Sequence, residues 1–154
     1  MTEFHGGELT LRVNGEDRLV RVRAADTLLR TLREGLGLTG AKCGCENGDC
    51  GACTVLLDGA PVKSCMILAV ECEGREITTI EGLRDHPVQA AFRAEHGFQC
   101  GFCTPGMILC AVALLRTHPN PDEATVRAWM EGNLCRCTGY EGVRKAIASA
   151  AGTG

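Results

Sequence analysis

The sequence predicts an α+β chain of two small domains, the first of strands with one helix and the second of helices alone. Alternating apolar and polar residues with turn signals fill the first half. Helical spacing of apolar residues replaces that alternation after the segment GLRDHP, residues 82–87. Most of the 11 cysteines in the 154 residues fall into two blocks, one in each half. We therefore expect domains at residues 1–81 and 82–154.

Two β-hairpins are predicted in the first half. Each consists of two alternating segments joined by an Asn-Gly or Asp-Gly pair, which favours a tight turn between strands. The segments are residues 9–13 with 19–23, joined by Asn14 and Gly15, and residues 54–57 with 62–65, joined by Asp58 and Gly59. Residues 76–80 are expected to add one more strand.

A helix should follow the first hairpin. Asp26 or Thr27 can cap its start, and glycines at positions 35 and 37 should end it. Its apolar face would carry Leu28, Leu29 and Leu32. Strand, strand, helix is the order in which a β-grasp fold opens.

Four short helices are predicted in the second half, at residues 88–95, 104–115, 122–130 and 142–150. Thr104 should cap the second of these and Pro105 should start it, because proline suits the first turn of a helix. Asp122 or Asn120 can cap the third. Four short helices in sequence suggest a four-helix bundle.

The composition limits the kinds of partner and compartment. A formal net charge of -3 without a basic block leaves no electrostatic footprint for nucleic acid. No run approaches the roughly 18 apolar residues of a membrane span. Residues 1–15 contain no apolar signal region, so a cytoplasmic location is expected. A reducing compartment and an odd cysteine count favour metal binding over disulfides.

The first cysteine set has the spacing C-x4-C-x2-C, formed by Cys45, Cys50 and Cys53, with Cys65 further along. This is the ligand spacing of plant-type 2Fe-2S ferredoxins, in which each iron takes two cysteine sulfurs. The glycines between these ligands are Gly44, Gly48 and Gly51. A loop folded tightly round a cluster needs them for positive φ angles and close amide approach.

The second set joins Cys100 and Cys103, in CGFC, to Cys135 and Cys137, in CRC. It places one pair at a helix start, where the positive end of the helix dipole would favour an anionic cluster. A tetrahedral zinc site is the alternative for both sets, and the second set taken alone leaves more room for it.

Three cysteines remain outside the two sets. Cys43, Cys72 and Cys110 are interpreted as small buried apolar residues, although Cys43 could compete as a ligand because it lies two residues before Cys45. The two aromatic residues Trp129 and Tyr140 are expected to pack within the helices.

These motifs resemble the small iron-sulfur subunit of the molybdenum hydroxylases, the family of xanthine oxidase and carbon monoxide dehydrogenase. The resemblance runs nearly end to end and rests on four strings in a fixed order. They are GCENGDCGACTVLLDG at residues 44–59, SC at 64–65, QCGFCTPGMI at 99–108 and GNLCRCTGY at 132–140.

The resemblance implies a β-grasp 2Fe-2S ferredoxin-like domain followed by a helical 2Fe-2S domain, in a complex with a large molybdopterin subunit and a medium FAD subunit. Such complexes are expected to be dimers of heterotrimers. Electrons would pass singly from molybdenum through the second cluster and then through the first to FAD. Gln99 and Cys137 would be hydrogen-bonded to the pterin, and this chain would perform no substrate chemistry.

Two other functions fit the spacing alone. A free-standing two-cluster ferredoxin needs no pterin partner, and a zinc-organised adaptor needs no iron. The substrate of the complex is not encoded in this chain, because the large subunit handles it.

Overall fold

Five strands form one mixed sheet within residues 6–151, the part of the chain that the computed structural model describes. They are β1 (Gly6–Val13), β2 (Glu16–Arg23), β3 (Thr54–Leu57), β4 (Ala60–Lys63) and β5 (Glu76–Thr78). Their order in the sheet is β2-β1-β5-β3-β4, with β1 parallel to β5 and the other pairs antiparallel. The predicted mixture of a sheet and helices is confirmed.

Both predicted hairpins are present, and their turn residues explain them. Asn14 and Gly15 have φ angles of 55° and 80°, and Asp58 and Gly59 have φ angles of 51° and 83°. Positive φ at both central residues matches the twist of the flanking strands, and these residue types tolerate it. The turns therefore set the registers of β1 with β2 and of β3 with β4.

Two predicted strands were too long. The second strand of the second hairpin ends at Lys63, because Ser64–Met66 turns into a 3₁₀ helix and the Ser64 hydroxyl donates to the Cys53 carbonyl at 2.6 Å. The last strand ends at Thr78, because Asn14 captures the Thr79 amide at 2.8 Å and a 3₁₀ turn follows.

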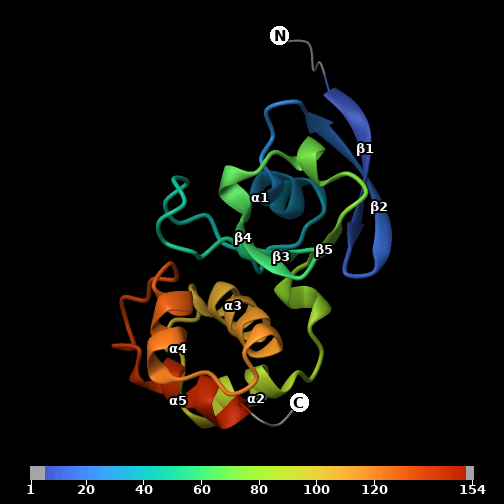
Figure 1. Ribbon diagram of the computed structural model, residues 1–154. Helices are drawn as coiled ribbons and strands as arrows, with labels where there is room; N and C mark the ends of the chain where they lie inside the picture. The colour runs from blue at the N-terminus through green and yellow to red at the C-terminus, as the bar shows by residue number, and fades with distance from the viewer. Residues whose placement is uncertain (1–5, 152–154) are drawn as a thin grey trace.

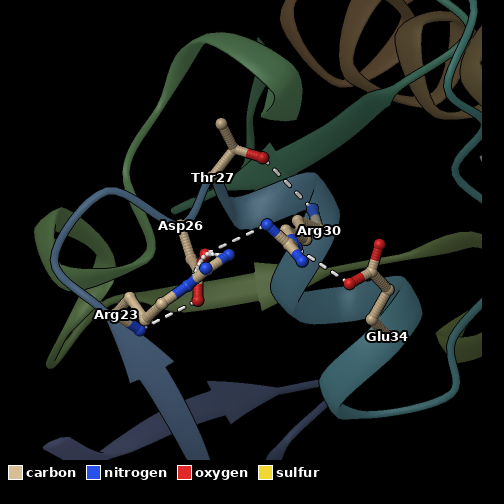
Figure 2. Close-up of polar contacts among 5 residues, drawn as sticks. All are labelled: Arg23, Asp26, Thr27, Arg30 and Glu34. Atoms are coloured by element: carbon tan, nitrogen blue, oxygen red, sulfur yellow. Dashed lines mark hydrogen bonds and ion pairs between the residues drawn. The ribbon is translucent and has the colours of Figure 1, made fainter. Parts of the chain in front are cut away.

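Thr27, rather than Asp26, caps the first helix. Its hydroxyl accepts a hydrogen bond from the Arg30 amide at 3.2 Å. Figure 2 shows that Asp26 instead accepts from the Arg23 amide at 2.8 Å, while the Arg30 guanidinium lies between Asp26 and Glu34. These bonds lower the pKa of Asp26, with the Arg23 amide as the largest cause.

The helix itself is α1 (Leu28–Arg30), which widens into a π-helical turn at Thr31–Gly35. Its predicted apolar face is buried, because Leu28, Leu29 and Leu32 all belong to the core beneath the sheet. The long loop that follows, residues 36–53, carries three cysteines of the first set, Cys45, Cys50 and Cys53, and leads into β3.

The second half contains α2 (Pro87–Ala94), α3 (Thr104–Thr117), α4 (Glu123–Met130) and α5 (Glu141–Ala150). Each lies within two residues of its predicted bounds. The N-cap of α3 is Cys103 and not Thr104, which is already the first helical residue. For α4 the cap is Asp122, whose carboxylate accepts from the Thr125 amide at 2.8 Å.

The sheet and the helices meet where α3 lies against β3 (Figure 1). Leu56 of β3 belongs to the core around α3, whereas its neighbours Val55 and Leu57 belong to the core beneath the sheet. All residues of α3 from Gly106 to Leu114 are buried, as expected of a helix that is apolar on every side. The helix that follows Cys103 is therefore held against the sheet.

Some predictions extend beyond the described residues. The two predicted domains include residues 1–5 and 152–154, which lie outside the described residues. The same holds for the first five residues of the segment 1–15, which was predicted to lack a signal region. None of the helices in residues 6–151 combines the length and the apolar character that crossing a membrane requires.

Candidate iron-sulfur sites

The four cysteines of the first set come together as two pairs. The Sγ atoms of Cys53 and Cys65 are 3.4 Å apart, since the 3₁₀ turn after β4 brings Cys65 back to the loop. In the other pair, the Cys50 amide donates to the Cys45 Sγ at 3.3 Å. The Gly48 amide also donates to the Cys65 sulfur, which ties the two pairs together.

The glycines in this loop serve the two purposes predicted for them. Gly48 and Gly51 have φ angles of 88° and 71°, which side chains rarely adopt. Gly44 instead provides space, because a Cβ at that position would lie 2.7 Å from the Cys50 Sγ. The loop can therefore direct backbone amides at the sulfurs.

The second set also forms two pairs. The Sγ atoms of Cys100 and Cys137 are 3.6 Å apart, and the thiols of Cys103 and Cys135 share a hydrogen bond. Cys103 is the N-cap of α3, and the loop between α4 and α5 supplies the sulfurs of Cys135 and Cys137. Two more donors reach the Cys135 Sγ, namely the Cys137 amide at 3.4 Å and the Thr138 hydroxyl at 3.2 Å.

The sets differ in exposure. Cys53 and Cys65 are buried in the first set, and no cysteine of that set is fully exposed. The second set buries Cys103 but exposes Cys100 and Cys137. Beside this exposed edge, the Gln99 side-chain amide donates to the Cys137 carbonyl at 3.0 Å. The second set thus has an exposed edge, formed by Cys100 and Cys137, that is accessible from outside the chain.

The sulfurs differ in acidity as well. Amide donation from Asn47 and then Cys50 lowers the pKa of Cys45 to about 7. Burial raises the pKa of Cys65 to about 11 and that of Cys103 to about 12, and each is raised further by the neighbouring thiol. Burial alone would raise the pKa of Cys135, but the donors from Thr138 and Cys137 outweigh it and lower that pKa.

This arrangement fits a diiron cluster. The sulfurs lie two by two, and each pair suits one iron of a 2Fe-2S centre. Amides and a hydroxyl donate to the sulfurs, which stabilises a thiolate-bound anionic cluster. Buried thiols would lose their protons on binding iron.

Three residues that support the second set were not predicted from the sequence. Tyr140 was expected to pack among helices, but it is 37% exposed and its hydroxyl accepts from the Cys135 amide at 2.8 Å. Its backbone is left-handed, with φ of 69°. The signal was its place three residues after CRC in GNLCRCTGY. Two other residues of that string, Asn133 and Thr138, were also overlooked.

The remaining cysteines behave differently from one another. Cys72 and Cys110 are buried, as predicted. Cys43 is exposed, contrary to expectation, because its side chain turns to Glu46, whose hydrogen bond is the largest cause of its raised pKa.

Trp129 does pack against the helical core, and its ring meets His118 edge-on with centroids 5.8 Å apart.

Two family models match the chain one after the other. The model described as 2Fe-2S iron-sulfur cluster binding domain matches residues 11–79. The model described as [2Fe-2S] binding domain matches residues 79–148. Each matched range contains one of the two cysteine sets.

Individual relatives match over nearly their whole length. The nicotine 6-hydroxylase small subunit of Paenarthrobacter nicotinovorans is 48% identical over 148 residues, which cover 94% of this chain and 90% of the relative. The nicotinate dehydrogenase small FeS subunit of Eubacterium barkeri is 43% identical over 143 residues, covering 90% and 91%. The chain belongs to the iron-sulfur subunits of the molybdenum hydroxylases.

A solved structure extends the likeness of this iron-sulfur subunit to three dimensions. In the crystal structure of quinoline 2-oxidoreductase from Pseudomonas putida 86, a chain with 46% identity superposes with a TM-score of 0.92, covering 95% of this subunit and 94% of that chain. The predicted family and the predicted role as an electron-transfer subunit of an oxidoreductase complex are confirmed. Which cysteine binds which iron stays a prediction.

Proposed function

We propose that this subunit relays single electrons between a molybdopterin centre on a large partner subunit and FAD on a medium partner subunit. The observation that carries the proposal is the gathering of eight cysteines into two sets of sulfur pairs, of which the first has no exposed cysteine and the second has an exposed edge. Each bound cluster would supply one-electron chemistry. The ligands are Cys45, Cys50, Cys53 and Cys65 on the flavin side, and Cys100, Cys103, Cys135 and Cys137 on the pterin side.

The exposed edge of the second set is the proposed contact with the pterin. Cys100 and Cys137 are exposed there, and Gln99 is held beside them by its bond to the Cys137 carbonyl. A side-chain amide in this position can offer both a donor and an acceptor to a heterocycle. Gln99 and Cys137 would thus bind the partner's cofactor without performing substrate chemistry.

The organisation proposed around these sites has two domains, residues 1–81 as a β-grasp and 82–154 as a four-helix bundle. The assembly proposed is a dimer of heterotrimers. A cytoplasmic location is proposed as well, because eight of the cysteines are proposed as metal ligands rather than disulfide partners, and reducing compartments favour that use of cysteine.

The test uses the complex purified from its native host. We expect iron and acid-labile sulfide in equal amounts, molybdenum and flavin in the same particle, and two distinguishable EPR signals after reduction. Cys100→Ser should remove the pterin-side signal and stop substrate-driven reduction of the flavin, while the flavin-side signal stays.

Three results would contradict this function. A monomer without molybdenum or flavin would indicate a free-standing ferredoxin. A colourless zinc protein without sulfide would indicate an adaptor. Equal loss of both EPR signals in Cys100→Ser would show that the two sets do not hold separate clusters.

A further inference from the structure

A backbone hydrogen bond links the loops that carry the two cysteine sets. The Leu134 amide donates to the Cys50 carbonyl at 2.8 Å. Cys50 belongs to the first set, and Leu134 directly precedes Cys135 of the second. The backbone path between these sulfurs is therefore covalent except at that bond. Figure 1 shows the two loops on the same side of the molecule, beside the junction of sheet and helices.

Asn133, the residue before Leu134, fastens this junction. It is 3% exposed, and its side-chain amide donates to the Gly51 carbonyl at 3.1 Å and to the Thr54 hydroxyl at 3.3 Å. Its Oδ1 accepts from the Lys63 ammonium at 3.4 Å. Lys63 also donates to the Gly132 carbonyl at 2.5 Å. Since every polar group of the Asn133 side chain has a partner in the first cysteine loop or on β3 and β4, the residue specifies one docking arrangement.

The backbones at this junction are too close for side chains to intervene. A Cβ at Gly51 would lie 2.7 Å from the Asn133 Nδ2 and would collide with the Gly132 carbonyl oxygen. A Cβ at Gly106, in the first turn of α3, would collide with the Gly51 carbonyl oxygen. The loops thus meet backbone to backbone, and Asn133 is the side chain that bonds across the contact from the second loop.

We propose that Asn133 is a positioning residue for electron exchange between the two clusters, because it holds the Leu134 amide on the Cys50 carbonyl. The proposal rests on the proposed function, and adds the residue that couples the two sites. In the exchange, one electron leaves a reduced cluster and enters the oxidised one, and no bond or proton changes place. The reductant is the substrate acting through the partner subunit.

The Leu134–Cys50 hydrogen bond is the one non-covalent step in this backbone path. Tunnelling falls off more steeply across a gap than along covalent bonds, so a looser Leu134–Cys50 contact slows exchange. Removing the Asn133 amide leaves the buried Gly51 carbonyl with one donor fewer and leaves the junction free to part. Residues in the outer shell of metal sites commonly change rates by about tenfold or more when mutated.

The experiment compares variants in the intact complex. Asn133→Ala removes the network, and Asn133→Asp keeps the size and the acceptor but removes the donor to Gly51. Asn14→Gly is the matched control, because Asn14 also bonds to a distant segment, at Thr79, but away from the cysteines. Glycine suits the positive φ at that position.

Both Asn133 variants should retain two clusters per chain by iron content and by EPR. The magnetic splitting between the two reduced clusters should shrink, and the rate of electron exchange between them after rapid reduction should fall about tenfold. Asn14→Gly should change neither quantity. Because stability alone cannot change the splitting in fully loaded protein, this readout separates positioning from folding.

Wild-type splitting and rate in fully loaded Asn133→Ala would overturn the proposal. If Asn133→Ala does not bind both clusters, Lys63→Met tests the same junction from its outer side. We expect a smaller decrease in both the magnetic splitting and the exchange rate. An unchanged exchange rate in that variant would contradict the proposal. Failure of the proposed function would look different, since the wild-type complex would then lack one cluster or show no exchange at all.

Discussion

The two CGxCT loops, residues 50–54 and 100–104, share a sequence and differ in surroundings. In each, the glycine adopts positive φ, 71° at Gly51 and 83° at Gly101. Around Gly51 the second loop presses closely, with the Asn133 amide 2.7 Å from where a Cβ would lie. Around Gly101 nothing lies within 4 Å of that point. The local sequence therefore determines the backbone conformation of each loop, and the residues packed around the loop determine how closely it is enclosed.

The threonines of the two loops show the same divergence. The Thr54 hydroxyl donates to the Gly51 carbonyl at 2.8 Å and accepts from Asn133. The Thr104 hydroxyl is buried and has no hydrogen-bond partner among the described residues. The first loop is thus locked into the interior, whereas the second keeps Cys100 exposed beside it. The proposed function gives these loops different tasks, insulation for the first and contact with a partner for the second.

The largest expected effects come from the buried cysteines, Cys53 in the first set and Cys103 in the second. We expect Cys53→Ser and Cys103→Ser each to lower the iron content by about half, because a cluster missing one thiolate is not retained. Iron and sulfide analysis with EPR measures this. The two variants should remove different signals; removal of the same signal by both would disprove two separate sites.

A methyl group at each loop glycine tests the role of the surroundings. Gly51→Ala should destabilise the loaded protein by about 3 kcal/mol, since strain at positive φ adds to a collision with Asn133. Gly101→Ala should cost only the strain, about 1 kcal/mol. Denaturant unfolding, followed by the visible absorbance of the clusters, gives both values. Equal losses would mean that the crowding at Gly51 is unimportant.

The paired threonines provide a smaller contrast. Thr54→Val removes two buried hydrogen bonds and should cost about 2 kcal/mol. Thr104→Val removes a hydroxyl without a protein partner and should change stability by less than about 0.5 kcal/mol. The same unfolding assay applies. A large loss in Thr104→Val would reveal a partner for that hydroxyl in the loaded protein.

The smallest expected effects concern two carboxylates beside helix starts, Asp26, which precedes the cap of α1, and Asp122, which caps α4. Hydrogen bonding lowers the pKa of both below 3.8, chiefly through the Arg23 amide for Asp26 and the Thr125 side chain for Asp122. A lowered folded pKa stabilises the protein above the unfolded value, and this contribution disappears as pH falls through the folded one.

Asp26→Asn and Asp122→Asn should therefore be less stable than wild type at pH 7 and should approach it in acid below pH 3.8. Unfolding midpoints between neutral and acid pH measure the difference. A difference that stays constant with pH would show that the ionised form of each carboxylate is not what stabilises its turn.

The sequence predictions were accurate where a feature depends on neighbouring residues, and less accurate where it depends on residues far apart in the sequence. The turns at Asn14 and Asp58 were predicted because their residue types fix their own φ angles. The strand ending at Lys63 was predicted too long, because a hydrogen bond from Ser64 to Cys53 turns the chain. Tyr140 was misjudged for a related reason, since the target of its hydroxyl lies in a loop without regular periodicity.

Ligand spacing, turn chemistry and helical periodicity are written within short stretches of chain, so residue types alone were enough to indicate two thiolate sets and a sheet followed by helices. The coupling of the sets was decided by tertiary structure. Asn133 meets Gly51 from 82 positions away, and Leu56 turns toward the helices while its neighbours face the sheet core. Such contacts depend on how two cores pack together, and no local pattern encodes that packing.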